Sequence, residues 1–157
     1  MKVLVTYYSR SGTTRRLAEA IAEGLGCEIE AIEDLRNRRG LFGFLLAGFD
    51  ATMGRLTRLK PLQKNPADYD LVAVGSPVWA GTVSAPIRTY LTENAARLPR
   101  VAFFLTSGDA VQEKALAQMA ASAGKQAQAT LTLTSAQIDK GEHGAEVKRF
   151  VEALTRA

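Results

Sequence analysis

The sequence predicts an α/β fold, a doubly wound five-stranded parallel sheet in the order 2-1-3-4-5 with helices on both faces. Two observations carry this prediction. Apolar runs of strand length alternate with segments of helical periodicity, and the runs end in Gly, Ser or Pro. Continuously apolar runs are typical of central parallel strands, whereas alternating runs are typical of edge strands. The chain has 157 residues, and we expect a single domain over residues 1–157.

The first half of the chain opens this pattern. Val3–Val5 is continuously apolar and predicts a central strand. Apolar residues at helical spacing over Leu17–Leu25 predict a helix, and Gly26 suits its C-terminal end. Glu28–Ile32 alternates polar and apolar residues, which predicts an edge strand.

The second half repeats the pattern. The continuous runs Leu71–Val74 and Val101–Leu105 predict two further central strands. Ala127–Leu133 alternates with Gln and Thr and predicts the second edge strand. Apolar residues at helical spacing predict a helix after each of these strands, over Ile87–Ala95, Val111–Ala123 and Val147–Leu154.

The stretch from Asp34 to Tyr69 fits less regularly. Large apolar residues crowd between Leu41 and Met53, with glycines among them. We expect the second crossover helix here, packed on the sheet and locally irregular because glycine destabilises helices. A surface that docks a partner or touches lipid is the alternative.

Positive charge gathers in the segment Arg36–Lys64. The whole chain carries a formal charge of +4, and this segment holds seven basic residues and one acidic residue. Such a segment is either a solvated face or an attractive surface for an acidic protein, a nucleic acid or an anionic membrane. Aromatic residues do not interleave with the arginines, so we expect no nucleic-acid partner.

Several functional classes are excluded by composition. The single cysteine, Cys27, excludes a disulfide framework and a cysteine-rich metal site. The single histidine, His143, argues against a histidine zinc site or a Ser-His-Asp triad. No apolar run reaches the roughly 18–20 residues that span a bilayer, and the N-terminal residues lack a signal-peptide pattern. We therefore expect a cytoplasmic protein with no metal, no catalytic side chain and no stable membrane insertion.

A hydroxyl-rich loop joins the first strand to the first helix. Backbone N–H groups at a helix N-terminus attract anions, and hydroxyls add neutral donors. Neither a Walker lysine nor GxGxxG is present, which favours a terminal phosphate monoester over a nucleoside triphosphate. Simple helix capping is the alternative. The candidate phosphate-binding residues are Ser9, Arg10, Ser11, Gly12, Thr13 and Thr14.

Two further loops, Gly75–Gly81 and Thr106–Asp109, follow the third and fourth predicted strands, and in this fold they share the ligand crevice with the first loop. Trp79, the only tryptophan, can stack on a planar ring or simply cover the end of the sheet. Asp109 can accept a hydrogen bond from a ligand or cap the next helix. The candidate residues are Pro77, Val78, Trp79, Ala80 and Gly81 in one loop, and Ser107, Gly108 and Asp109 in the other.

At this point the chain resembles the flavodoxin-like family of FMN-binding proteins, in its short-chain form. Ser9, Ser11, Gly12 and Thr14 match the family's phosphate signature, Ser/Thr-x-Ser/Thr-Gly-x-Ser/Thr. The resemblance implies FMN as cofactor, with its phosphate on residues 9–14. It also implies that Trp79 stacks on the flavin and that the loop at residues 107–109 contacts the far side of the ring.

The chain departs from the family in two respects. Gln112 stands where many flavodoxins carry an aromatic residue, three positions after the Gly-Asp pair, and the chain is basic where flavodoxins are acidic. The first functional hypothesis is a low-potential electron carrier served by a flavin-dependent reductase and an acceptor protein, for which the basic segment suits acidic partners. The second is an FMN-dependent oxidoreductase acting on a small molecule such as a quinone or porphyrinogen. The third is an FMN-independent interaction module.

Overall fold

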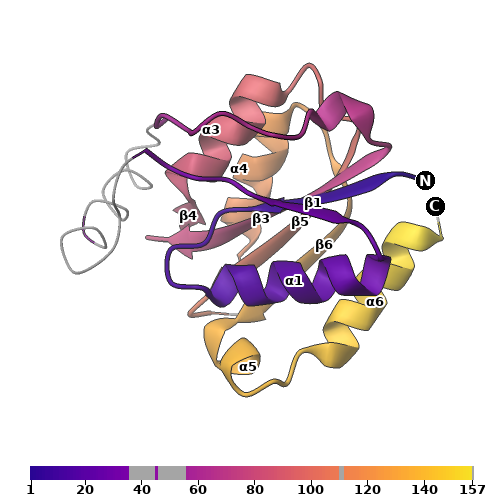
Figure 1. The fold of residues 1–157 in the computed structure, drawn as a ribbon. Coiled ribbons are helices and arrows are strands. Elements are labelled where there is room, and N and C mark those ends of the chain that lie inside the picture. Colours follow the sequence, from indigo (N-terminus) through magenta and orange to yellow (C-terminus); the bar gives the residue numbers. More distant parts are fainter. Residues whose placement is uncertain (36–44, 46–55, 110–111, 157) are drawn as a thin grey trace.

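A parallel β-sheet forms the middle layer of the computed structural model (Figure 1), which describes residues 1–35, 45, 56–109 and 112–156. Its parallel strands follow the spatial order β2-β1-β3-β5-β6. They are β1 (Val3–Tyr7), β2 (Glu28–Ala31), β3 (Leu71–Trp79), β5 (Arg100–Ser107) and β6 (Ala127–Thr134).

The sheet differs from the predicted one by an additional strand. The short strand β4 (Thr82–Val83) pairs antiparallel with the end of β3. It was not predicted because two residues are too few to show a periodicity. The strands at the two edges are β2 and β6, whose alternating sequences indicated that position.

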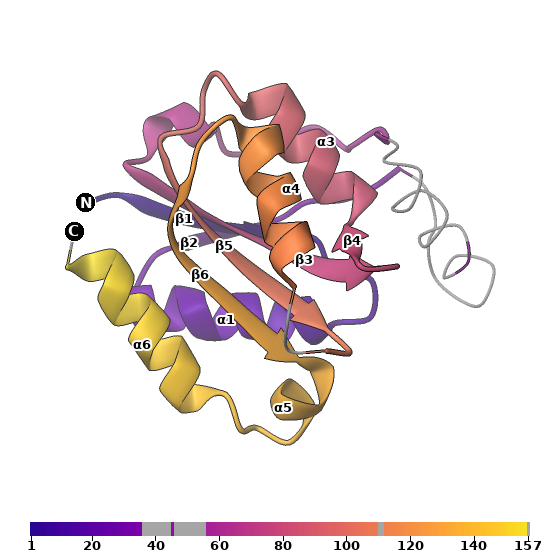
Figure 2. The ribbon, with the colours of Figure 1, turned by 180° about the vertical axis from the view of Figure 1, so that it is seen from behind.

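Helices cover both faces of the sheet, as Figures 1 and 2 show from opposite sides. One face carries α1 (Thr13–Leu25), α5 (Ser135–Asp139) and α6 (Gly144–Thr155). The other carries α3 (Ala85–Asn94) and α4 (Glu113–Ala123), and a 3-10 turn, η1 (Pro66–Asp68), precedes β3.

Helix ends follow local chemistry. Gly26 adopts φ 60° after α1 and donates its N–H to the helix's last carbonyls, as the sequence predicts. The short helix α5 was not predicted, although it begins with a capping box between Thr134 and Gln137. Five residues are too few for helical periodicity to appear in the sequence.

The hydrophobic core lies in two layers, one on each side of the sheet. Leu4, Val72 and Phe103 belong to the layer under α3 and α4. Val5 and Phe104 belong to the layer under α1 and α6. The central strands are continuously apolar because they are buried on both faces.

The expected crossover helix between β2 and β3 falls almost entirely outside the described residues, as do Arg36, Arg38, Arg39 and Arg55 of the basic segment. The described residues on either side pair with each other. Leu35 donates its N–H to the Arg58 carbonyl at 3.0 Å, and an isolated antiparallel bridge joins Asp34 to Leu59. The chain therefore returns beside the position from which it left the end of β2.

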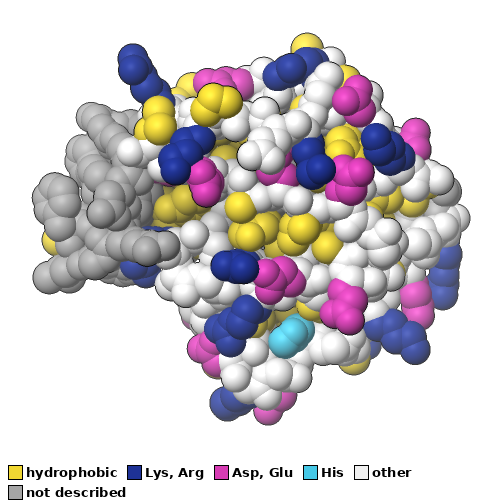
Figure 3. All heavy atoms as spheres, in the orientation of Figure 1, with side chains coloured by type: hydrophobic (Ala, Val, Ile, Leu, Met, Phe, Trp, Pro, Cys, Tyr) yellow, Lys and Arg dark blue, Asp and Glu magenta, His cyan; other side chains and the backbone are white. Residues whose placement is uncertain are grey.

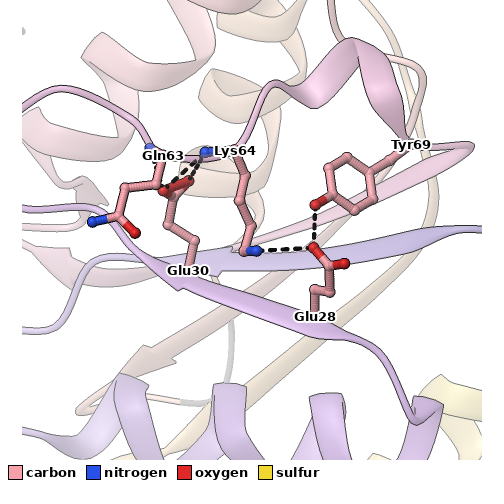
Figure 4. Close-up of polar contacts among 5 residues, drawn as sticks. All are labelled: Glu28, Glu30, Gln63, Lys64 and Tyr69. Carbon is pink, nitrogen blue, oxygen red and sulfur yellow. Dashed lines mark hydrogen bonds and ion pairs between the residues drawn. The ribbon is translucent and has the colours of Figure 1, made fainter.

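The described part of the basic segment meets acidic residues in and just after β2. Lys60 pairs with Glu33 at 3.0 Å and Lys64 with Glu28 at 2.9 Å. Figure 4 shows Lys64 and Tyr69 converging on Glu28. Basic and acidic side chains are correspondingly interspersed over the face drawn in Figure 3. These two lysines are therefore partly neutralised within the molecule. An acidic partner stays a prediction.

None of the helices within the described ranges is both long and apolar enough to cross a membrane.

Candidate functional site

The three predicted loops meet at one edge of the sheet, beyond the carboxyl ends of β1, β3 and β5. The register places Tyr7, the last residue of β1, beside Gly75, and Thr106, near the end of β5, beside Pro77. Both β1 and β5 therefore end beside the second half of β3. This edge includes the topological switch point between β1 and β3, where the connections that follow the two strands lead to opposite faces of the sheet. Ligands bind at such switch points in doubly wound sheets.

The loop before α1 is shaped to receive an anion. Gly12, at φ 101°, donates its N–H to Ser9 Oγ at 3.0 Å. The Gly12 carbonyl accepts the N–H of Arg16 at 3.1 Å. The N–H groups of Thr13, Thr14 and Arg15 lie before this first helical hydrogen bond, so they have no carbonyl acceptor within the helix. No side chain caps this end of α1, which leaves the donors that a phosphate requires.

The hydroxyls of this loop are not equivalent. Ser11 is exposed and Ser9 and Thr13 are half-buried, whereas Thr14 is only 2% exposed. The Thr14 hydroxyl lies 2.7 Å from the hydroxyl of Thr106, near the end of β5. Thr106 was not among the candidate residues. It was expected to open the third loop, but it and Ser107 are the last two residues of β5.

Two arginines in the first turn of α1 are paired with acidic residues. Arg15 bonds Glu19 at 2.8 Å, and Arg16 pairs with Asp139 of α5. All four side chains are largely exposed. These pairs offset part of the positive charge beside the phosphate loop.

The second predicted loop is mostly strand. Pro77, Val78 and Trp79 belong to β3, and only Ala80 and Gly81 form the turn to β4. Both turn residues have positive φ, 51° and 73°, as the two-residue turns that suit the twist of β-hairpins require. The prediction of a loop over residues 75–81 was therefore wrong for its first five residues, because pairing with β4 and β5 continues the strand.

Hydrogen bonds hold this hairpin from several sides. Thr82 donates its hydroxyl to the Trp79 carbonyl at 3.0 Å. Val83 donates its N–H to Gln118 Oε1 of α4 at 3.1 Å. At its base the hydroxyls of Ser76 and Ser84 lie 2.8 Å apart. The hairpin is thus fastened both to β3 and to α4.

Trp79 is packed against the first loop. Its side chain is 8% exposed and meets Tyr8 edge to face, with ring centroids 5.4 Å apart and planes at 89°. Tyr8 directly precedes the phosphate loop. The contact therefore ties the aromatic residue of the second loop to the loop that is expected to hold phosphate. Stacking of Trp79 on a flavin stays a prediction.

The third loop is organised around the carbonyl of Asp109. The buried Ser107 donates its hydroxyl to this carbonyl, and Gln112 Nε2 donates to it at 3.3 Å. Gly108 and Asp109 are exposed. Gln112 is the N-cap residue of α4, so Asp109 does not cap that helix. Asp109 is left in a position to contact a ligand.

Cys27 and His143 lie at the starts of other elements. Cys27 directly precedes β2, and burial raises the pKa of its thiol, which makes a nucleophilic role unfavourable. His143 is the N-cap residue of α6. In the described ranges, no three His, Cys, Asp or Glu side chains are grouped so that they could hold a metal ion.

The chain matches the model of a known protein family. The model of the NADPH-dependent FMN reductases matches residues 1–155. The chain belongs to this family. The membership supports a flavodoxin-like, FMN-binding fold, but it does not support the narrower expectation of a short-chain flavodoxin. No match was found among curated proteins.

Solved structures agree with this fold. A flavoprotein from Lactobacillus acidophilus NCFM in complex with FMN is 26% identical, with a TM-score of 0.72 over 88% of this chain and 97% of that chain. A Bacteroides uniformis flavoprotein is 21% identical, with a TM-score of 0.74 over 96% and 97%. Megasphaera elsdenii flavodoxin is 18% identical, with a TM-score of 0.62 over 99% of both chains. The family and the FMN complex indicate that FMN is the cofactor of this chain.

Proposed function

We propose that this protein is an FMN-dependent oxidoreductase that takes electrons from NADPH and reduces a small acceptor of the quinone class. The alternative of a low-potential electron carrier rests only on the flavodoxin-like fold, which serves several functions. The family match over residues 1–155 favours the reductase.

The sequence and hydrogen bonds of the third loop support a reductase. From Ser107 to Gln112 the sequence contains no aromatic residue. The Gln112 side chain folds back on the Asp109 carbonyl instead. A flavin placed against Trp79 would therefore have one ring face that this loop does not cover with an aromatic side chain. A nicotinamide or a quinone needs such a face in order to exchange a hydride or electrons with a flavin.

The residues present fit FMN. The uncapped start of α1 and the hydroxyls of Ser9, Ser11 and Thr13 would hold the phosphate. Trp79, braced by Tyr8, would contact the ring. Bound FMN supplies the redox chemistry, accepting a hydride from NADPH and passing two electrons to the acceptor. The chain's own side chains bind and orient, and none is required as an acid or base.

Anaerobic reduction by NADPH tests the proposal. The FMN-loaded protein is mixed with NADPH alone while flavin absorbance is followed, and a soluble benzoquinone is then added. We expect flavin bleaching by NADPH, reoxidation by the quinone, and steady NADPH consumption when both are present. Gly12→Val should lose FMN and turnover, because φ 101° is unsuited to a β-branched residue. Gly144→Ala is the matched control, since a Cβ there meets nothing within 4 Å.

The electron-carrier hypothesis predicts a different result. The loaded protein would then stay oxidised with NADPH alone, accept electrons only through a separate flavin-dependent reductase, and pass them one at a time to a protein acceptor. That outcome would refute the proposed reductase while leaving FMN binding intact.

A further inference from the structure

The outer edge of β4, away from β3, is bonded to two helices. In an antiparallel pair, opposite residues exchange either both backbone hydrogen bonds or neither. Val78 and Val83 are opposite each other, and the backbone of Val83 makes its hydrogen bonds elsewhere. Its N–H donates to Gln118 Oε1 of α4 at 3.1 Å, and its carbonyl accepts from Arg88 Nη2 of α3 at 3.3 Å. Two side chains therefore take the place of a neighbouring strand at this edge.

Water cannot replace these partners. Val83 is 0% exposed, and in the two-residue strand β4 only one other residue pairs with β3. Trp79 and Val83 share a core cluster with Ala115 and Met119 of α4. The hydrogen bond to Gln118 is therefore made where the hairpin and α4 already pack together. Without it, the N–H of Val83 would be buried and unpaired, and the hairpin would have to move to satisfy it.

Helix α4 also reaches the third loop. Gln112, its N-cap residue, donates from Nε2 to the Asp109 carbonyl at 3.3 Å. One helix thus holds, through two glutamines, the two loops that are expected to flank the flavin ring. Helix α1, whose first turn is expected to hold the phosphate, lies on the other face of the sheet (Figures 1 and 2). The attachment by α4 is therefore confined to the ring end of the predicted site.

We propose that Gln118 is a positioning residue for the flavin ring: by accepting the Val83 N–H it fixes the hairpin that carries Trp79, and it acts on the cofactor through that hairpin. The inference rests on the FMN binding included in the proposed function and on the predicted contact of Trp79 with the ring. It assigns a role to a glutamine that lies outside the three loops, and the role is specific to the ring end of the cofactor.

Gln118→Leu tests this role, because it fills a similar space but removes the acceptor. Apo-protein is titrated with FMN and with riboflavin, the dissociation constant Kd is read from flavin fluorescence, and inorganic phosphate is measured as a competitor of FMN. We expect both flavin Kd values to rise about tenfold, because binding must restore the position of the hairpin. Riboflavin lacks the phosphate, so equal rises assign the loss to the ring. The inhibition constant of phosphate should change by less than about twofold.

Two further substitutions separate the hydrogen bond from the volume of the side chain. Gln118→Glu keeps an oxygen that can accept the Val83 N–H, so we expect it to restore both flavin Kd values to within about twofold of the wild type. Gln118→Asn withdraws the acceptor by one methylene and should behave like Gln118→Leu, and it gives the same measurement if the leucine variant does not fold. A glutamate variant as weak as the leucine variant would overturn the proposal.

The double variant with Trp79→Ala separates an indirect role from a direct one. If Gln118 acts through the hairpin that carries Trp79, then Gln118→Leu should weaken riboflavin binding much less in the Trp79→Ala background than in the wild type. Fully additive losses would mean that Gln118 acts on the flavin independently of Trp79, and would refute the positioning role.

Gln128→Leu is the matched control, because the substitution is the same and both glutamines are half-buried. Gln128 lies near the start of β6, at the opposite end of the sheet from the loops, where it bonds Arg100 and the Leu154 carbonyl. We expect this variant to lose stability with both flavin Kd values unchanged.

Three results for Gln118→Leu would contradict the role: a rise in the FMN Kd alone, an equal weakening of phosphate, or no change with either flavin. Because neither NADPH nor an acceptor is added, failure of the reductase proposal would not alter these outcomes. A wild-type protein that binds neither flavin would refute the FMN binding itself, and the inference with it.

Discussion

Phe104 occupies the space where a side chain of Gly75 would lie. The two residues pair across β3 and β5, and a Cβ on Gly75 would come within 2.0 Å of Phe104 Cε2. The glycine is therefore required by the packing of a fully buried ring beneath the strand that leads to the hairpin. Its backbone also accepts the N–H of Tyr8 at 3.1 Å, so the site and the core meet here.

Substitution at this position should be costly. We expect Gly75→Ala to lower the free energy of unfolding by about 3 kcal/mol, because neither the ring nor the strand can move freely in a close-packed core. Urea denaturation measures the loss. Gly75→Ala combined with Phe104→Leu should recover part of it, whereas Gly144→Ala should be nearly neutral. A Gly75→Ala protein as stable as the wild type would show that the ring relaxes without penalty.

Trp79 should affect both stability and flavin binding. Trp79→Ala removes a buried aromatic side chain and its contact with Tyr8, so we expect a loss of about 3 kcal/mol in unfolding free energy. If Trp79 contacts the flavin, the FMN Kd should also rise about 3- to 10-fold and fluorescence quenching should weaken. A loss of stability with unchanged FMN affinity would instead assign Trp79 to covering the end of the sheet.

The hairpin turn contains a residue in an unfavourable conformation. Ala80 has φ 51°, where a non-glycine residue is disfavoured by about 1–2 kcal/mol. Glycine relieves this strain but adds about 0.4–1 kcal/mol of unfolded-state entropy. We therefore expect Ala80→Gly to stabilise the protein by about 0.5 kcal/mol, seen as a higher melting temperature. Gly81→Ala, at φ 73°, is the converse control and should lower it.

The stability of the β2 edge should depend on acid pH. The hydrogen bond from Tyr69 and the ion pair with Lys64 lower the pKa of Glu28. The folded state therefore holds this proton less tightly than the unfolded state. The resulting stabilisation is present above the usual glutamate pKa and is lost as the pH falls through the lower, folded value.

Denaturation of Glu28→Gln at several pH values tests this expectation. Between pH ~5 and pH ~3 the unfolding free energy of the wild type should fall more steeply than that of Glu28→Gln. Tyr69→Phe, which removes one donor to the carboxylate, should be intermediate. Parallel curves for wild type and Glu28→Gln would show that Glu28 does not contribute to the acid sensitivity.

Much of the architecture was predictable because its signals are local. Val101–Leu105 indicated a central strand by its continuous apolar character, and β5 is buried on both faces. Gly26 indicated the end of α1, and it adopts the left-handed conformation there. The hydroxyl-rich loop before α1 could be predicted to be an anion site because the relevant donors belong to consecutive residues, and anion binding there stays a prediction.

The features missed are those that depend on distant or very short segments. Strand β4 contains two residues and exists because the turn at Ala80–Gly81 folds the chain back on β3. The expectation that Gly75–Trp79 form a loop was wrong because these residues pair with β5 and β4. The crossover helix expected near Leu41–Met53 lies outside the described residues, so it stays a prediction.

The sequence by itself determined the alternation of strands and helices, the edge or central position of each strand, and the run of donors in the first loop from which phosphate binding is predicted. These depend on periodicity and on neighbouring donors along the chain. Only the tertiary structure decided that Thr14 meets Thr106, that Tyr8 braces Trp79 and that Phe104 fills the place beside Gly75. Such pairs depend on strand order and register, which bring residues together across large sequence separations that no local pattern records.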